Sequence, residues 1–110
     1  MRVCALVGDL MDRSRVSGAI EGVQFVRDAT ACAGADVVVI DLARSGDQIA
    51  AVRAAAPDAR LVAFGPHVDE AGAEAATAAG ADVVMPRSRF FRDPKRALAD
   101  PGADPAARTV

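Results

Sequence analysis

The pattern of apolar and polar residues along the chain is dominated by one short apolar run. Residues 35–42 read Ala-Asp-Val-Val-Val-Ile-Asp-Leu, with four β-branched side chains in succession before the carboxylate of Asp41. Such a run is typical of a β-strand buried on both faces, because polar residues stop alternating with apolar ones when neither face meets water. In an open parallel sheet, ligands bind beyond the carboxyl ends of the strands. The pattern therefore places Asp41 where such a protein carries out its chemistry.

Further apolar runs predict four more strands, at residues 2–7, 23–26, 61–64 and 81–85. Segments with helical spacing lie between and after these runs and predict helices at residues 12–21, 28–33, 45–54, 69–79 and 94–99. Asp12 is expected to cap the first helix, and Ser45 with Gln48 matches a capping box for the third. Asp93 followed by Pro94 is a start signal for the last helix.

The segment between residues 12 and 34 has a second interpretation. Apolar side chains also fall on one face of a single long helix, with Gly22 tolerated inside it: Val16, Ile20, Val23 and Ala33. The sheet would then lose its second strand. We favour the version with five strands, in which the connection after the second strand is too short for more than one or two turns of helix.

Strands that alternate with helices through a short chain indicate an α/β protein with a parallel sheet and helices on both faces. Right-handed crossovers leave few topologies, and the flavodoxin-like, doubly wound strand order 2-1-3-4-5 is the natural one. The 110 residues have room for a single core. We expect one domain over residues 1–100, with a shortened second helix, and a flexible tail over residues 101–110.

Composition and charge narrow the classes of function. The net charge of -2 provides no general attraction to nucleic acid or to an anionic membrane. No apolar run approaches the roughly 20 residues of a membrane-spanning helix, and no signal peptide is expected before the first strand. Cys4 and Cys32 lack the spacing of a metal site and suit buried thiols in a reducing cytoplasm.

The motifs of common enzyme classes are missing from the sequence. There is no Gly-x-Gly-x-x-Gly, no Gly-Lys-Ser/Thr, and no Asp-x-His-x-x-Gly of the kind that binds cobalamin. No Ser-His-Asp or Cys-His set can be assembled, so we expect no catalytic residue and no enzymatic activity. The single histidine, His67, follows Gly65-Pro66 in a loop at the end of the fourth strand. There it could be a solvated side chain or could take part in a pocket, and both interpretations stay open.

Three short motifs, taken together and in order, carry a resemblance to a known family. They are Leu6-Val7-Gly8-Asp9, Val37-Val38-Val39-Ile40-Asp41-Leu42 and Ala78-Ala79-Gly80-Ala81-Asp82. Over about residues 2–99 the chain resembles the CheY-like receiver domain of bacterial two-component response regulators. The stretch between Asp9 and Asp41 is shorter than is usual in that family, which bears on the second strand and helix.

The resemblance implies roles for three residues. Asp41 matches the aspartate that accepts a phosphoryl group, and Asp9 matches the second member of the acidic pair that holds Mg²⁺ together with it. Arg87 falls at the position of the lysine that contacts the phosphoryl oxygens. Carboxylates and a cation suit this chemistry, because they hold the metal and neutralise the transferred group.

The chain departs from the family pattern at several of these positions. Gly8 stands where the first acidic residue is expected, Gly65 where a Thr or Ser ends the fourth strand, and Ser88 where a Pro follows the lysine. One carboxylate fewer weakens Mg²⁺ binding, and the planar guanidinium of Arg87 does not substitute for a compact ammonium. We therefore interpret the chain as a stand-alone degenerate receiver that requires no cofactor and binds Mg²⁺ weakly.

Two other interpretations stay open. Asp41 could be a working phosphoryl acceptor with Arg87 in place of the lysine, or Asp41 could simply pair with Arg87 as a solvated carboxylate. A small-molecule-binding or hydrolytic domain, a different class of protein, would use the polar residues at the strand ends: Asp9, Asp41, His67 and Arg87.

A basic cluster near the end of the chain predicts a surface for protein partners or self-association. Five cations lie within ten residues, beside two phenylalanines: Arg87, Arg89, Arg92, Lys95 and Arg96, with Phe90 and Phe91. The plain alternative is a solvated entry to the last helix. The family commonly uses its fourth helix, fifth strand and fifth helix as the partner face, which implies contact through Arg89, Phe90, Phe91 and Arg92. Nucleic acid is a less suitable partner, because no recognition motif accompanies the cluster.

Overall fold

The structure is a computed structural model that describes residues 1–66 and 69–99. Its centre is a parallel sheet of five strands in the order β2-β1-β3-β4-β5, which confirms the predicted topology. The strands are β1 (Val3–Leu6), β2 (Gln24–Phe25), β3 (Val37–Asp41), β4 (Arg60–Gly65) and β5 (Val83–Pro86). All five residues of β3 are buried, as its unbroken apolar run requires.

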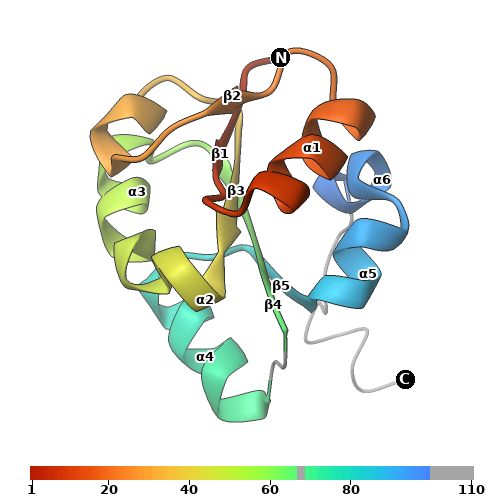
Figure 1. The fold of residues 1–110 in the computed structure, drawn as a ribbon. Helices are drawn as coiled ribbons and strands as arrows, with labels where there is room; N and C mark the ends of the chain where they lie inside the picture. Colours follow the sequence, from red (N-terminus) through yellow and green to blue (C-terminus); the bar gives the residue numbers. More distant parts are fainter. Residues whose placement is uncertain (67–68, 100–110) are drawn as a thin grey trace.

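Helices cover both faces of the sheet (Figure 1). On one face lie α1 (Leu10–Ala19), α5 (Arg87–Arg92) and α6 (Pro94–Leu98). On the other lie α2 (Leu42–Ser45), α3 (Ile49–Ala55) and α4 (Glu70–Ala79), together with the short 3₁₀ helices η1 (Ala29–Cys32) and η2 (Gly46–Gln48). In the part of the chain that is described, no helix has the length and apolar character needed to cross a membrane.

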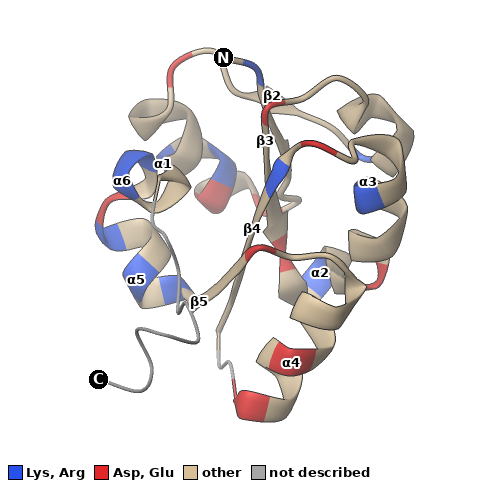
Figure 2. Ribbon diagram, turned by 180° about the vertical axis from the view of Figure 1, so that it is seen from behind, with Lys and Arg blue, Asp and Glu red and all other residues tan. Residues whose placement is uncertain are grey.

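Basic residues are most frequent on the layer formed by α1, α5 and α6. In Figure 2, Lys and Arg mark α1, α5 and α6, although α1 also carries Asp12. On the other layer, α2 and α3 each carry one arginine, and the charged residues of α4 are glutamates. The layer formed by α1, α5 and α6 is therefore the more basic side of a chain whose net charge is -2.

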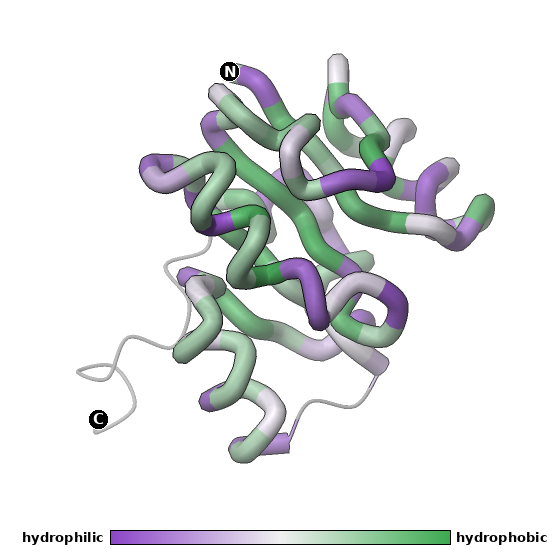
Figure 3. The backbone as a smooth tube through the Cα atoms, turned by 90° about the vertical axis from the view of Figure 1, so that its left-hand side faces the viewer, coloured by the Kyte–Doolittle hydropathy of each residue, from purple (hydrophilic) through white to green (hydrophobic). Residues whose placement is uncertain are grey.

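Two apolar clusters form the core, one on each face of the sheet. Side chains of β3 alternate between them: Val38 and Ile40 pack beneath α3, whereas Val37 and Val39 pack beneath α1 and α6. Figure 3 shows the strands as continuous hydrophobic segments inside a shell of mixed polarity. Small side chains on the helices allow both layers to lie close to the sheet.

The second strand and the shortened helix after it are both present. Gly22 has φ 76°, a left-handed conformation that a continuous α-helix does not contain. The alternative with one long helix is therefore wrong. The connection from β2 contains only η1, which Asp28 caps by accepting hydrogen bonds from the Thr30 amide (2.7 Å) and hydroxyl (2.8 Å). The connection is too short for a full helix, as predicted.

Several helix boundaries differ from the predictions. Asp9, not Asp12, caps α1, and the helix expected over residues 45–54 is broken into α2, η2 and α3. Asp41 caps a helix immediately at the end of β3, so helical structure begins earlier and Ser45 makes no side-chain capping bond. Residues 87–92, which were not predicted to be helical, form α5, while Asp93 caps α6 as predicted by accepting from the Arg96 amide (3.2 Å).

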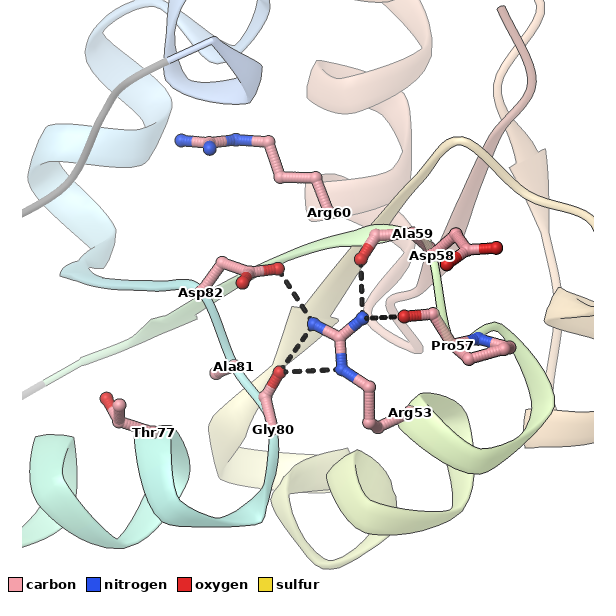
Figure 4. Close-up of a pocket in the computed structure, with 9 residues that line it drawn as sticks. All are labelled: Arg53, Pro57, Asp58, Ala59, Arg60, Thr77, Gly80, Ala81 and Asp82. Carbon is pink, nitrogen blue, oxygen red and sulfur yellow. Dashed lines mark hydrogen bonds and ion pairs between the residues drawn. The ribbon is translucent and has the colours of Figure 1, made fainter.

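At the amino-terminal edge of the sheet, Arg53 joins α3 to the turn between α4 and β5 (Figure 4). Its guanidinium donates to the carbonyl oxygens of Gly80 (2.7 Å), Ala59 (2.6 Å) and Pro57 (3.0 Å), and to Asp82 Oδ2 (2.8 Å). Because all of these acceptors belong to the chain itself, we interpret the open hollow around Arg53 as a structural contact between α3 and the turn before β5, not as a ligand site. The expected tail, residues 101–110, lies outside the described residues, so its predicted flexibility stays a prediction.

Candidate functional site

The carboxyl ends of the strands bring together most of the polar residues that the sequence singled out. Strand register places Asp41 of β3 beside Phe64 of β4, and Phe64 beside Met85 of β5. Asp9 follows β1, and Arg87 begins the helix that follows β5. A hollow of about 400 Å³ lies among these ends, with Asp9, Asp41 and Arg87 in its wall.

Both predicted acidic residues serve as helix caps. Asp41 is 2% exposed, and its Oδ1 accepts a hydrogen bond from the Ala43 amide (3.0 Å) at the start of α2. Asp9 accepts from the Asp12 amide (3.0 Å) at the start of α1. Each carboxylate therefore has one oxygen directed at a helix amide.

Arg87 forms a two-pronged ion pair with Asp12, so the pairing with Asp41 that we considered is wrong. Arg87 Nη2 lies 2.6 Å from Asp12 Oδ1, and Nη1 lies 2.8 Å from Asp12 Oδ2. Asp12 is 4% exposed, and its side chain joins α1 to α5 across the end of the sheet. The planar fork of an arginine matches a carboxylate in this geometry, which a lysine could not do.

The environment of the Arg87–Asp12 pair favours charge on both partners. The Arg87 guanidinium carbon lies 5.0 Å from the ring centre of Phe91 and 5.6 Å from that of Phe64. The hydrogen bond from Arg87 holds the pKa of Asp12 below its ordinary value of 3.8, although burial acts in the opposite direction. The same hydrogen bond raises the pKa of Arg87. The pair is thus ionised throughout the physiological range.

A second arginine lies beside Asp9. Arg44, on α2, has Nη2 3.9 Å from Asp9 Oδ2. Its side chain also covers Gly8, because a Cβ atom at Gly8 would lie 3.5 Å from Arg44 Nη1 and 3.6 Å from Arg44 Cδ. Where the family pattern has the first carboxylate of the acidic pair, this chain therefore has Gly8, with the Arg44 side chain against it.

The donors at this edge are a poor match for a resident Mg²⁺ ion. Mg²⁺ requires oxygen ligands in a nearly octahedral arrangement and binds through carboxylates. Of the described carboxylates that line this hollow, Asp12 is paired with Arg87, and Asp9 and Asp41 each have an oxygen on a helix amide. The guanidinium of Arg44 lies next to Asp9. Within residues 1–66 and 69–99, no three acidic, cysteine or histidine side chains converge as a metal site.

The four residues of the predicted partner face differ in exposure, and whether they contact a partner stays a prediction. Phe90 is fully buried and stacks on Phe64 with ring centres 4.7 Å apart, so its inclusion in a contact surface is wrong. Phe91 is half-buried and meets both rings edge-on, at 5.2 Å and 5.0 Å. Arg89 and Arg92 are exposed on α5. Two adjacent phenylalanines can both pack here because they lie on α5, a helix that was not predicted from the sequence.

The remaining predicted positions carry little polar chemistry. Gly65 ends β4 and is buried, and it has no hydroxyl group that could meet a phosphoryl group. Ser88 lies in the first turn of α5 and is exposed. His67 lies outside the described residues, so its part in a pocket stays a prediction.

Sequence reasoning missed Asp12 and Arg44 as members of the site. Asp12 follows Asp9 by three residues, and once Asp9 is identified as the cap, Asp12 falls in the first turn of α1 beside the strand ends. That spacing is a signal that could have been used. Nothing in the sequence indicates that Arg44 turns back toward Gly8.

No protein-family model matches the sequence, and no curated protein matches it. The fold, however, is that of response regulator receiver domains. One similar structure is a response regulator protein from Burkholderia pseudomallei with a phosphorylated aspartic acid, a calcium ion and citrate; it has a TM-score of 0.80 and 18% identity, covering 100% of this chain and 74% of the other.

Two further structures are similar in the same way. The isolated receiver domain of RcsB from Salmonella enterica serovar Typhimurium has a TM-score of 0.70 at 18% identity, over 90% of this chain and 85% of its own. A response regulator from Thermotoga maritima has a TM-score of 0.67 at 17% identity, over 90% of this chain and 98% of its own. At these identities the likeness establishes the fold.

Proposed function

We propose that this chain is a degenerate receiver domain that acts in signalling by binding a protein partner, without being switched by phosphorylation. The observation that carries the proposal is the ion pair between Arg87 and Asp12. The cation at the end of β5, which in the family pattern would contact a phosphoryl group, donates both of its terminal nitrogens to a carboxylate of the same chain. A phosphoryl group on Asp41 would have to compete with Asp12 for it.

Two neighbouring positions support the same conclusion. Gly8 removes one of the carboxylates that hold Mg²⁺, and Arg44 brings a positive charge to the other. Gly65 provides no hydroxyl that could move toward a modified Asp41 and reposition the loop after β4. Both the charge-neutralising chemistry and the mechanical response of a receiver are therefore weakened in this chain.

We further propose that the exposed part of α5 contributes to the partner surface. Arg92 is exposed and Phe91 is half-buried, and interfaces favour aromatic and arginine side chains in combination. The basic character of α1, α5 and α6 fits a partner with acidic groups (Figure 2). Arg92→Glu should abolish capture of the partner or self-association, while Arg27→Glu, an exposed change elsewhere, should not.

Phosphorylation is the direct test of the main proposal. The protein is incubated with acetyl phosphate and Mg²⁺ and its intact mass is measured, with Asp41→Asn as the control. We expect no phosphorylated species in either protein. A phosphoryl adduct in the wild type that disappears in Asp41→Asn would overturn the proposal and would identify Asp41 as a working acceptor with Arg87 in place of lysine.

A further inference from the structure

A third hollow also lies at the amino-terminal edge of the sheet, between α1 and α6. Its volume is about 940 Å³, compared with about 400 Å³ for the hollow at the carboxyl edge. Its walls come from the last turn of α1, the starts of β1, β3 and β4, and the end of α6. It shares no residue with the proposed site around Asp41.

The inner wall of this hollow is apolar. Val3, Ile20, Val37 and Leu98 line it and belong to the core cluster on this face, and each is only 4–6% exposed. Among the described residues, the hollow is bounded by the last turn of α1 on one side and by Leu98, at the end of α6, on the other. At Gly18, on that turn, a Cβ atom would have no heavy atom within 4 Å. Concave, mainly apolar sites of this size are typical of small-molecule binding.

One polar side chain in the hollow has a hydrogen-bonding group without a partner. Arg60 leaves β4 on the side away from the Arg53 cluster (Figure 4), and its Nε donates to the carbonyl oxygen of Leu98 (2.9 Å). Its Nη2 is covered, yet among the described residues it has no hydrogen-bond acceptor. A buried donor without an acceptor is unfavourable, so an oxygen atom is expected here.

The other charged groups of the hollow lie at its rim. Lys95 is exposed on α6, on the same side as Arg60. Asp36 accepts a hydrogen bond from the Arg2 amide (2.7 Å), and Glu21 is exposed beyond α1. Arg60 and Lys95 therefore line the hollow beside α6, whereas Glu21 follows α1 and Asp36 precedes β3.

We propose that this hollow binds a small carboxylic acid with an apolar body. The carboxylate accepts from Arg60 Nη2 after a small displacement of the guanidinium, and the apolar body lies against Ile20 and Leu98. An apolar compound without an acidic head would leave Nη2 unsatisfied, and a short acid without a body would gain nothing from the apolar wall. The two parts of the ligand are thus selected by different parts of the hollow.

Octanoate is a suitable probe, with octanol and acetate as matched compounds that each lack one half of it. Amide signals of the full chain are followed by NMR during titration. We expect octanoate to shift residues 17–21 and 95–99 saturably, with a dissociation constant below about 1 mM, and to leave residues 9, 41 and 87 unchanged. Octanol and acetate should produce much smaller shifts at the same concentrations.

Three variants separate this proposal from non-specific binding. Arg60→Gln should weaken octanoate binding about tenfold, the loss expected for a hydrogen bond to a charged group. Gly18→Leu, which leaves Arg60 intact and fills the hollow, should abolish binding. Arg27→Gln, an exposed change elsewhere, should have no effect.

Several results would overturn the proposal. They are equal binding of octanol, unchanged affinity in Arg60→Gln or Gly18→Leu, and the absence of saturable shifts in the wild type. Contacts between residues 100–110 and Ile20 or Leu98 in the free protein would also overturn it, because the chain's own C-terminal segment would then occupy the hollow.

Discussion

At the scale of single residues, the carboxyl edge of the sheet contains its own counter-charges. Arg87 is paired with Asp12 and lies over two aromatic rings, and Arg44 lies beside Asp9. The two pairs differ in environment. The side chain of Asp12 is 5% exposed, whereas those of Arg44 and Asp9 are 60% and 41% exposed. Solvent screens the second pair, so the first should dominate the stability of the site.

Replacing Asp12 should therefore destabilise the protein far more than breaking the exposed pair. Asp12→Asn leaves the Arg87 guanidinium without its carboxylate, and we expect a loss of about 2–3 kcal/mol in the free energy of unfolding. Arg44→Gln should cost less than about 1 kcal/mol. Urea unfolding followed by circular dichroism measures both free energies of unfolding. Equal losses would show that the Arg87–Asp12 pair contributes no more to stability than the exposed pair.

The same pair predicts how stability depends on pH. Because the folded pKa of Asp12 is lowered below 3.8, its contribution is fully present above that pH and is lost as the pH falls through the lower, folded value. The wild type should be more stable than Asp12→Asn near neutral pH, and the two should converge in acid below pH 3.8. A difference that stays constant with pH would contradict this assignment.

At the scale of elements, the turn between α4 and β5 is fixed by contact with α3. Gly80 ends α4 with φ 128°, and a Cβ atom there would lie 2.8 Å from Arg53 Cβ. The Arg53 guanidinium bonds to the Gly80 carbonyl and to Asp82, which in turn accepts from the Leu61 amide (2.9 Å). One arginine thus connects α3, α4 and β4.

Gly80→Ala should destabilise the protein by about 2 kcal/mol or more, because alanine strains the backbone at this φ and its methyl group meets Arg53. Gly18→Ala is the matched control, since its helix position is open and alanine reduces the freedom of the unfolded chain. We expect it to stabilise by about 0.5–1 kcal/mol. Thermal unfolding of the two variants tests the contrast; similar shifts in Tm would refute it.

The elements also show how far the sequence could be used. Three features could be predicted because each depends on local chemistry: the buried run of β3, the glycine at the end of α4 and the Asp93-Pro94 start of α6. The break of the expected third helix was not predicted, because Asp41 was considered only for its chemistry and not as a cap. Likewise, the pairing of Asp12 with Arg87 depends on two residues 75 positions apart, a contact that no local pattern encodes.

At the scale of the whole molecule, two thiols lie in the apolar cluster beneath α3, and their reactivity can be used to measure the opening of that cluster. Cys4 in β1 and Cys32 in η1 are both fully buried. Burial, with a smaller effect of the nearby Cys4, raises the pKa of the Cys32 thiol to about 11, so little reactive thiolate forms at neutral pH.

Alkylation by iodoacetamide should therefore require unfolding of the domain. We expect both cysteines to be unreactive in buffer and to react in parallel as urea crosses the unfolding midpoint, with each site followed by peptide mass spectrometry. Rapid modification of Cys32 alone in buffer would show instead that η1 opens independently of the sheet.

The proposed function depends on Arg87 remaining with Asp12 when a phosphoryl mimic is offered. The most direct measurement is an NMR titration of the protein with beryllofluoride and Mg²⁺, following the Arg87 side-chain Nε–H signal and the backbone amides of Asp41 and Arg87. We predict that these signals do not move. A saturable shift of the Arg87 signal together with the Asp41 amide would mean that the guanidinium leaves Asp12 for the mimic, and would contradict the account.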